Sequence, residues 1–319
     1  MPAPSTFDTA AYGNANWQSR DLDHGQEIGS VWGQCGIDSE WGDLRAVLLH
    51  CPGPELSESE SDPEKVQMLA PVDWSLAAEE HARLAETYRQ CGVEVFDVQP
   101  RQPASPNQMF CADLFAMTPQ GAILARPAST VRAGEEVQVA RRLTDLEVPI
   151  LRTLTGNATF EGADLIWITA EHALLGLGLR TNIEAAEQIA ETLDVIGVEL
   201  SAVDMPFGTM HLMGMLRIVS RDLALAWPRR TPHRAVTALR ESGYRVEFLP
   251  EHDEFDHGKA FNFVTLGAMK ILMVGNNPFA RDYYESLGIE CVQTPATELS
   301  KAAGAVGCLT GVLEREKAR

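Results

Sequence analysis

The sequence predicts an α/β fold of five repeated units, each made of two strands, a helix and a third strand. A short phrase of glycine followed by β-favouring residues recurs along the chain, amphipathic helical patterns precede it, and pairs of strand patterns precede the helices. The repeat is roughly 45–55 residues long, a period that is typical of repeat architectures. Five such units arranged in a ring would place equivalent loops around one axis.

The glycine phrases mark the third strand of each unit. They occur at 90–98, 195–203, 241–249 and 286–294, and 145–154 holds the same place without its glycine. A glycine at the end of a helix followed by β-rich residues indicates a helix C-terminus and then a strand. Apolar residues near positions i, i+3 and i+4 predict the preceding helices, which we expect over 73–90, 135–143, 181–195, 233–242 and 278–287.

Strand pairs separated by short polar or glycine-containing turns predict β-hairpins before four of these helices. The hairpins pair 113–117 with 121–127, 164–168 with 173–179, 215–219 with 223–228, and 263–267 with 270–274. A further strand is expected within 44–52.

Residues that can carry chemistry stand at the start of successive units. They are Asp113, Asp164, His211, Asn262 and Cys308, at separations of about 50 residues. A single cysteine is usually a small buried hydrophobe. The shared repeat position instead predicts that the thiol, the imidazole and the carboxylates meet on the axis.

Composition narrows the class of protein. The chain has 319 residues, enough for one or two domains, and has no basic, apolar leader and no apolar run of membrane-spanning length. Its six cysteines form no CxxC pair, so we expect reduced thiols and a cytoplasmic location. The net charge of −19 argues against nucleic acid and suits a small cationic substrate, although an acidic surface also serves solubility. The sequence leaves open whether the protein forms a homo-oligomer.

Three motifs carry a resemblance to a known superfamily. They are TFEGADLIWITAEHALLGLGLRTNIEAAEQIAETL at 159–193, MHLMG at 210–214 and KAAGAVGCLT at 301–310. In this order they resemble the amidinotransferase, arginine deiminase and dimethylargininase superfamily, and dimethylargininase most closely. The resemblance covers roughly 42–316 and implies the pentein fold, a fivefold pseudosymmetric α/β propeller. We therefore expect a catalytic domain over 42–319, preceded by an extension over 1–41.

The resemblance implies a catalytic role for three residues. Cys308 matches the nucleophile, His211 the general acid and base, and Glu161 the carboxylate that orients the histidine. A guanidinium carbon is a poor electrophile, so covalent catalysis by a thiolate divides a difficult displacement into two easier steps.

Four further residues match substrate-binding positions. Asp113 matches the carboxylate that holds the guanidinium and Asp164 a supporting carboxylate, while Arg126 and Arg180 match arginines that grip a substrate carboxylate. A structural role for Asp164 at its strand start, and surface ion pairs for the two arginines, remain open as alternatives.

Three departures from the superfamily pattern bear on the substrate. Met213, Ala112 and Asn107 stand where relatives often place acidic residues. A site with fewer carboxylates suits a guanidinium with fewer donors, because each buried donor that lacks a partner weakens binding. We therefore expect an N-substituted guanidino compound to be preferred over free arginine.

The expected activity is that of a cysteine hydrolase that forms a covalent amidino-thioether and releases a ureido product with an amine or ammonia. An amidinotransferase and a non-catalytic binding protein of the same fold are the alternatives. No cofactor and no metal are expected, since EHDEFDHG at 251–258 lacks the spacing of a metal site and indicates a solvated loop. The acidic stretch 54–66 indicates a mobile surface loop, for which a role as a lid is an alternative.

Overall fold

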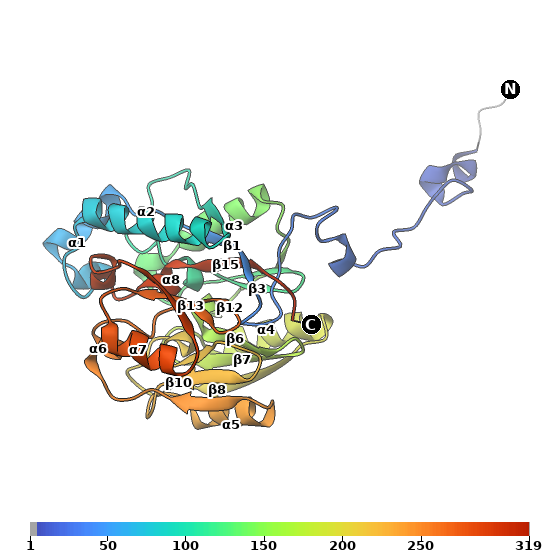
Figure 1. The fold of residues 1–319 in the computed structure, drawn as a ribbon. Helices are drawn as coiled ribbons and strands as arrows, with labels where there is room; N and C mark the ends of the chain where they lie inside the picture. The colour runs from blue at the N-terminus through green and yellow to red at the C-terminus, as the bar shows by residue number, and fades with distance from the viewer. Residues whose placement is uncertain (1–4, 319) are drawn as a thin grey trace.

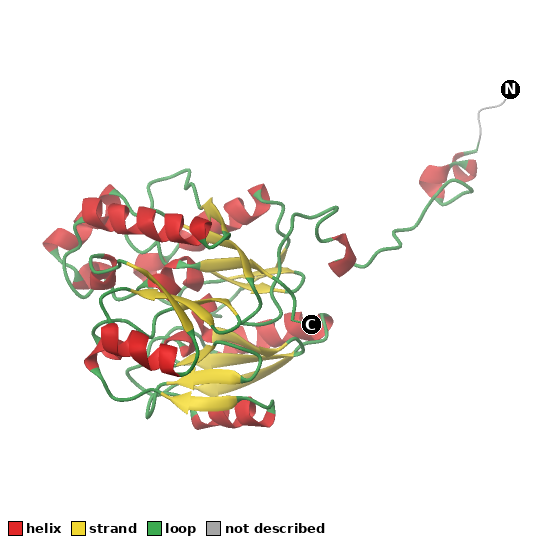
Figure 2. Ribbon diagram, viewed as in Figure 1, coloured by secondary structure: helices red, strands yellow, loops and turns green. Residues whose placement is uncertain are grey.

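The computed structural model describes residues 5–318, except for the side chains of residues 60 and 61. Five three-stranded sheets and their helices form the body of the molecule (Figures 1 and 2). In every sheet the central strand pairs antiparallel with one neighbour and parallel with the other. A helix connects the two parallel strands, as a parallel crossover requires. This is the predicted pentein propeller.

Four sheets are built from consecutive chain segments. In chain order, their strands are β3 (Phe115–Thr118), β4 (Gly121–Leu124) and β5 (Ile150–Thr153); β6 (Leu165–Thr169), β7 (His172–Leu177) and β8 (Glu199–Asp204); β9 (Leu216–Ile218), β10 (Leu223–Ala226) and β11 (Arg245–Phe248); and β12 (Val264–Gly267), β13 (Lys270–Val274) and β14 (Glu290–Thr294).

The fifth sheet joins the two ends of the domain. It contains β1 (Leu44–Leu49) and β2 (Glu94–Asp97) from the start of the domain, and β15 (Gly311–Arg315) from its end. β15 pairs antiparallel with β1 and so takes the place of the first strand of that unit. The ring therefore closes through a contact between residues about 270 positions apart, which no local pattern in the sequence reports.

The five predicted helices are confirmed to within two residues at each end. They are α2 (Trp74–Gln90), α3 (Glu135–Asp145), α4 (Ile183–Val195), α5 (His233–Glu241) and α7 (Pro278–Ser286), and the shorter helices are α1 (Glu58–Ser61), α6 (Asp253–Asp256) and α8 (Val306–Leu309). Side-chain caps help to set the starts of α2 and α4. The side chain of Asp73 accepts hydrogen bonds from the backbone N–H groups of Ser75 and Leu76, and that of Asn182 accepts one from the N–H of Ala185. Such caps satisfy backbone donors that a helix start leaves free.

The repeated glycine follows four of the five long helices in a left-handed conformation. Gly92, Gly197, Gly243 and Gly288 have φ between 77° and 89°, where a side chain would be strained. In the unit without the glycine, Glu147 takes this position with φ of 58°. The local geometry is therefore conserved in all five units even where the residue is not.

The N-terminal segment divides into two parts. Residues 5–20 extend away from the body (Figure 1), whereas Cys35, Ile37 and Ser39 are buried. Gly36 donates to the carbonyl of Leu313 at 2.8 Å and accepts from the backbone of Arg315 at 3.0 Å, which fastens this segment beside β15. The boundary between an extension 1–41 and a domain 42–319 stays a prediction, and residues 1–4 and 319 lie outside the described part.

Within residues 5–318, no helix combines the length and the apolar character needed to cross a membrane.

Candidate active site

The residues at the starts of the units come together at one end of the ring. Asp113 ends a 3-10 helix (Cys111–Asp113) before β3, and His211 caps another (Leu212–Gly214) before β9. Cys308 lies in α8 before β15, and Asn262 lies two residues before β12. One pocket is lined by Asp113, His211 and Cys308 together. The repeat thus delivers one functional side chain from each of several units to a common site.

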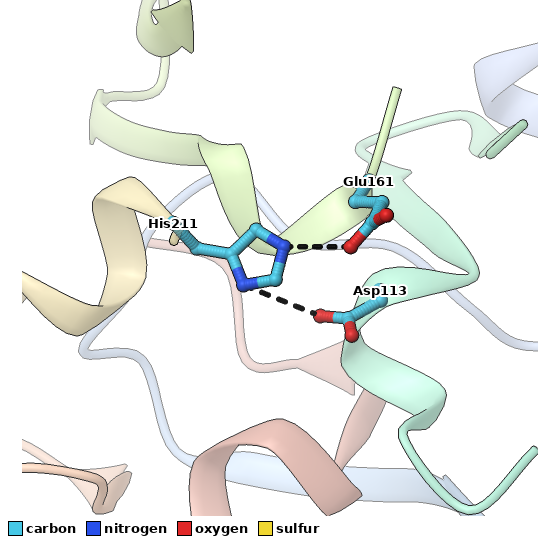
Figure 3. A group of neighbouring side chains, drawn as sticks. All are labelled: Asp113, Glu161 and His211. Atoms are coloured by element: carbon cyan, nitrogen blue, oxygen red, sulfur yellow. Dashed lines mark hydrogen bonds and ion pairs between the residues drawn. The ribbon is translucent and has the colours of Figure 1, made fainter. Parts of the chain in front are cut away.

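The imidazole of His211 lies between two carboxylates (Figure 3). Its Nε2 lies 2.7 Å from Oε2 of Glu161, and its Nδ1 lies 3.8 Å from Oδ1 of Asp113. Burial disfavours the positive charge of the imidazole, but Asp113, Glu161 and Asp164 raise the pKa of His211 to about 9. Burial likewise opposes ionisation of Glu161, yet His211, Arg132 and Arg180 lower the pKa of that carboxyl to about 2. At neutral pH the pair is an imidazolium hydrogen-bonded to a carboxylate.

The thiol of Cys308 is held by an amide. Nδ2 of Asn262 donates to Sγ at 3.0 Å, and the backbone N–H of Cys308 donates to Oδ1 of Asn262 at 3.1 Å. Burial and the charge of Asp113 raise the pKa of the thiol, while the bond from Asn262 and the charge of Arg217 oppose this rise. The free site therefore holds a thiol that needs further positive charge to ionise.

Arg132 is a buried residue of the site that the sequence analysis missed. Its guanidinium lies 2.7 Å from Asp113, 2.9 Å from Glu135 and 3.4 Å from Glu161. Burial opposes its charge, but these three carboxylates raise the pKa of Arg132 above its ordinary value. Arg132 does not occupy a repeat-equivalent position, and the only local signal was the i, i+3 spacing to Glu135.

Asp113 keeps one oxygen available. Its Oδ2 accepts from Arg132, whereas Oδ1 is buried and accepts no hydrogen bond from the described residues. A buried acceptor without a partner is costly and rare in a folded protein. Since Asp113 lines the pocket that contains Cys308, this oxygen is available to a donor that enters the pocket.

Asp164 uses both carboxylate oxygens within the protein. Oδ2 accepts from the hydroxyl of Thr181 at 2.6 Å, and Oδ1 accepts from the backbone of Leu212 at 3.0 Å. Leu212 follows His211 directly in the chain, so this carboxylate fixes the backbone that carries the imidazole. The structure thus gives Asp164 the structural contacts that the sequence left open as the alternative to substrate binding.

The two predicted carboxylate-binding arginines differ. Arg180 lines the pocket and its Nη1 lies 3.1 Å from Oε1 of Glu161. Arg126 is exposed and donates through Nη1 to the carbonyl of Ala158 at 2.8 Å. Only Arg180 is therefore brought to the same pocket as Cys308.

The acidic stretch 54–66 leads into the rim of the pocket. It forms α1 and short 3-10 turns, and the next residue, Gln67, lines the pocket. Gln67 donates to the hydroxyl of Ser129 at 2.6 Å, and Asn107 donates to the carbonyl of Val66 at 2.8 Å. These bonds hold the C-terminal end of the stretch beside the pocket, and the lid role considered from the sequence stays a prediction.

Asp113, Glu161 and His211 are close enough to share a metal ion, since their ligand atoms lie within 4.8 Å of one another. Their charges are already matched, however, because Arg132 contacts both carboxylates and the pKa of His211 is raised to about 9. A histidine must have a neutral imidazole to bind a metal ion. The donor set therefore suits an ion-pair network better than a metal centre.

A ring of five such units, with a thiol, an imidazole and carboxylates at one end of its axis, defines a pentein of the guanidino-modifying class. The family model of eukaryotic N,N-dimethylarginine dimethylhydrolase matches residues 65–308. The chain therefore belongs to the dimethylarginine dimethylaminohydrolase family, whose members are hydrolases acting on C–N bonds of linear amidines.

Individual relatives agree with this assignment. A dimethylarginine dimethylaminohydrolase of Pseudomonas aeruginosa is 22% identical over 242 residues, which are 76% of this chain and 90% of that protein. One of Mycobacterium tuberculosis is 27% identical over 245 residues, covering 77% and 78% of the two chains.

Solved structures share the fold. A dimethylarginine dimethylaminohydrolase adduct with S-methyl-L-thiocitrulline superposes with a TM-score of 0.71 at 20% identity, over 85% of this chain and 100% of the other. The amidinotransferase SxtG of Microseira wollei gives 0.72 at 14% identity, over 88% and 97%.

Proposed function

We propose that this hydrolase acts on an N-substituted, arginine-like guanidino compound, with Cys308 as nucleophile, His211 as general acid and base, and Glu161 as the group that orients the imidazole. The observation that carries the proposal is the buried Oδ1 of Asp113, which accepts no hydrogen bond from the described residues and lies in the pocket of Cys308 and His211. This oxygen has no hydrogen-bond donor within the part of the chain that the structure describes. A guanidinium is a cation with several N–H donors in its plane, so it can supply one.

In the first step the thiolate of Cys308 attacks the guanidinium carbon and a C–S bond forms. The C–N bond to the departing nitrogen then breaks as that nitrogen takes a proton from His211. Because Nε2 of His211 is bound to Glu161, Nδ1 is the atom that exchanges this proton. The product of this step is an amidino-thioether and a free amine.

In the second step water attacks the same carbon. His211, now neutral, accepts one proton of the water as the C–O bond forms. The C–S bond then breaks, and the second proton of the water passes to the departing sulfur, which returns as the free thiol. A ureido compound leaves. Glu161 stabilises the imidazolium in each half of the cycle, and its buried position strengthens that interaction.

The preference for an N-substituted substrate rests on the carboxylate count. Arg132 already donates to Oδ2 of Asp113. Asp113 therefore offers the substrate one oxygen and cannot accept two parallel hydrogen bonds from a guanidinium. Met213 faces the adjoining cavity and Asn107 donates to Val66. Ala112 lines a different cavity. A guanidinium with fewer donors leaves fewer of them unpaired.

The test is to compare catalytic efficiency for arginine, mono- and dimethylated arginine, and alkylguanidines without a carboxylate, by following ureido product and released amine. Cys308→Ser should lose turnover with the fold intact, and activity within about tenfold of the parent would remove Cys308 from this role. His211→Ala should form any Cys308 adduct slowly in mass spectra. A clear preference for free arginine would refute the substrate argument.

Two alternatives can be separated by the same assay. Adding an amine acceptor detects an amidinotransferase as a new guanidino product, and no covalent adduct with any substrate would indicate a binding protein. A cytoplasmic location is proposed on the cysteines, all six of which are free. A small cationic substrate, with no nucleic acid and no membrane as partner, completes the proposal, and oligomerisation is left to measurement.

A further inference from the structure

A second and larger cavity meets the substrate pocket at the catalytic residues. The pocket that contains Asp113 and Arg180 has a volume of about 30 Å³. The adjoining cavity has a volume of about 200 Å³ and shares Cys308 and His211 with the pocket. A group bonded to a guanidinium beside Sγ of Cys308 can therefore extend into either space, and only the second has room for a large one.

Part of the wall of this cavity is apolar and aromatic. Phe255 and Phe261 are each 2% exposed, and Trp227 meets Phe261 edge to face with ring centroids 6.0 Å apart. The sulfur-containing side chains of Met213 and Met215 complete the wall. Such surfaces favour aromatic and aliphatic groups.

The backbone around Trp227 is fixed by hydrogen bonds. Its N–H donates to the carbonyl of Met215 at 2.9 Å, and the hydroxyl of Thr231 donates to the carbonyls of both Met215 and Trp227. The wall is therefore formed before any ligand enters, which limits the entropy that binding must overcome.

The charges that face the cavity disfavour a second cation. Arg230 lies 4.2 Å above the ring of Trp227 and pairs with Asp256 at 2.8 Å, so these two charges cancel. Lys259 and Arg217 also line the cavity, and Nε and Nη2 of Arg217 donate to no acceptor among the described residues. The remaining charge is positive, so a substituent that enters should carry no positive charge of its own.

We infer that this cavity binds an uncharged apolar substituent on one guanidino nitrogen of the substrate, of about the size of an aromatic ring. The inference rests on the proposed function, because the guanidinium itself must lie at Cys308. For comparison of size, an apolar protein cavity of about 150 Å³ accepts benzene, and the volume here is larger. A single methyl group would leave most of this space unfilled.

Gly214 provides the means to test the cavity without changing a catalytic group. It lines the cavity, a Cβ added there would meet no atom within 4 Å, and its φ does not require glycine. Gly214→Leu should fill part of the space, and Gly214→Ala is the matched control that adds one carbon. Both variants should unfold at the same temperature as the parent.

The experiment compares benzylguanidine with methylguanidine. In the parent, catalytic efficiency should be at least about tenfold higher for benzylguanidine, from the buried apolar surface of the ring. Gly214→Leu should remove that advantage while the value for methylguanidine changes by less than about twofold, and Gly214→Ala should keep most of it. Equal efficiencies for the two compounds in the parent, or an equal loss for both in Gly214→Leu, would overturn the inference and leave the proposed function in place.

If neither compound is turned over, the affinities of benzylguanidine and methylguanidine for the Cys308→Ser variant test the cavity assignment separately from the proposed function. In calorimetry, tighter binding of benzylguanidine than of methylguanidine, lost in Cys308→Ser combined with Gly214→Leu, would support the cavity assignment while the proposed function fails. Equal affinities would refute the cavity assignment by themselves.

Discussion

Asn262 and Cys308 hold each other through two hydrogen bonds, from the amide Nδ2 to Sγ at 3.0 Å and from the cysteine backbone N–H to the amide Oδ1 at 3.1 Å. They occupy equivalent positions in two units of the ring, so the repeat itself sets their contact. An amide donates to a thiolate, whereas a carboxylate would repel it. We therefore expect Asn262 to act on the ionisation of Cys308, the proposed nucleophile, without reacting itself.

Asn262→Asp should raise the pKa of the Cys308 thiol, because a negative charge replaces a donor. We expect the rate of Cys308 alkylation by iodoacetamide at neutral pH to fall at least about tenfold, which corresponds to one pKa unit. Asn157→Asp, at an exposed position, is the matched control and should react as the parent does. An unchanged rate in Asn262→Asp would mean that the amide does not influence the thiolate.

A cationic ligand should lower the pKa of the Cys308 thiol. Burial and Asp113 raise this pKa in the free protein, and a guanidinium bound at Asp113 would cancel the unfavourable charge. The measurement is the alkylation rate as a function of pH, with and without a non-reactive amidinium compound that occupies the site but is small enough to leave Sγ accessible. The same inflection in both profiles would show that substrate binding does not help to generate the thiolate.

Removing the buried guanidinium should leave three carboxylates without their common partner. Arg132→Met is expected to lower the free energy of unfolding by about 3–5 kcal/mol, as is typical when one member of a buried ion pair is removed. The control is Arg152→Met, which breaks a more exposed pair with Glu191 and should cost less than about 1 kcal/mol. Urea denaturation measures both. Similar losses in the two variants would contradict a special role for Arg132.

Stability should fall as the His211–Glu161 ion pair loses a charge. The pKa of His211 is raised to about 9, above the value of about 6.5 in an unfolded chain. Its contribution is therefore complete below about pH 6.5 and is lost as the pH rises through about 9. The contribution of Glu161, with a pKa lowered to about 2, is instead lost as the pH falls from about 4.5 towards 2.

The comparison is urea unfolding of the parent and of His211→Asn at about pH 6 and pH 9.5, which lie on either side of the histidine titration. The parent should lose more stability than the variant between the two values. A parallel decline in both would assign the alkaline loss to other groups.

Glu147→Gly should stabilise the fold by about 0.5 kcal/mol, because glycine removes the side-chain strain at φ of 58° but adds freedom to the unfolded chain. The opposite change in the equivalent position of another unit, Gly197→Ala, should destabilise by about 1 kcal/mol, although a Cβ there meets no neighbouring atom. Thermal unfolding of both variants tests the shared left-handed geometry.

The sequence by itself determined the units, and it predicted the end of each unit at which the proposed active site lies. Helix periodicity, the glycine after each helix and the alternation of strands are local properties, so they can be read from neighbouring residues. His211, Asp113 and Cys308 were found because each stands at the same place in its repeat, and a ring brings equivalent places together.

The tertiary structure alone decided how the polar groups are shared. The chain closes by pairing β15 with β1, Arg132 takes one oxygen of Asp113, and Asp164 turns both of its oxygens to Thr181 and Leu212. The identity of an acidic residue or an arginine in the sequence does not reveal whether its side chain binds a substrate or a neighbouring backbone group. Which partner it meets depends on distances of a few ångströms between segments far apart in the chain, and only the packed structure sets those distances.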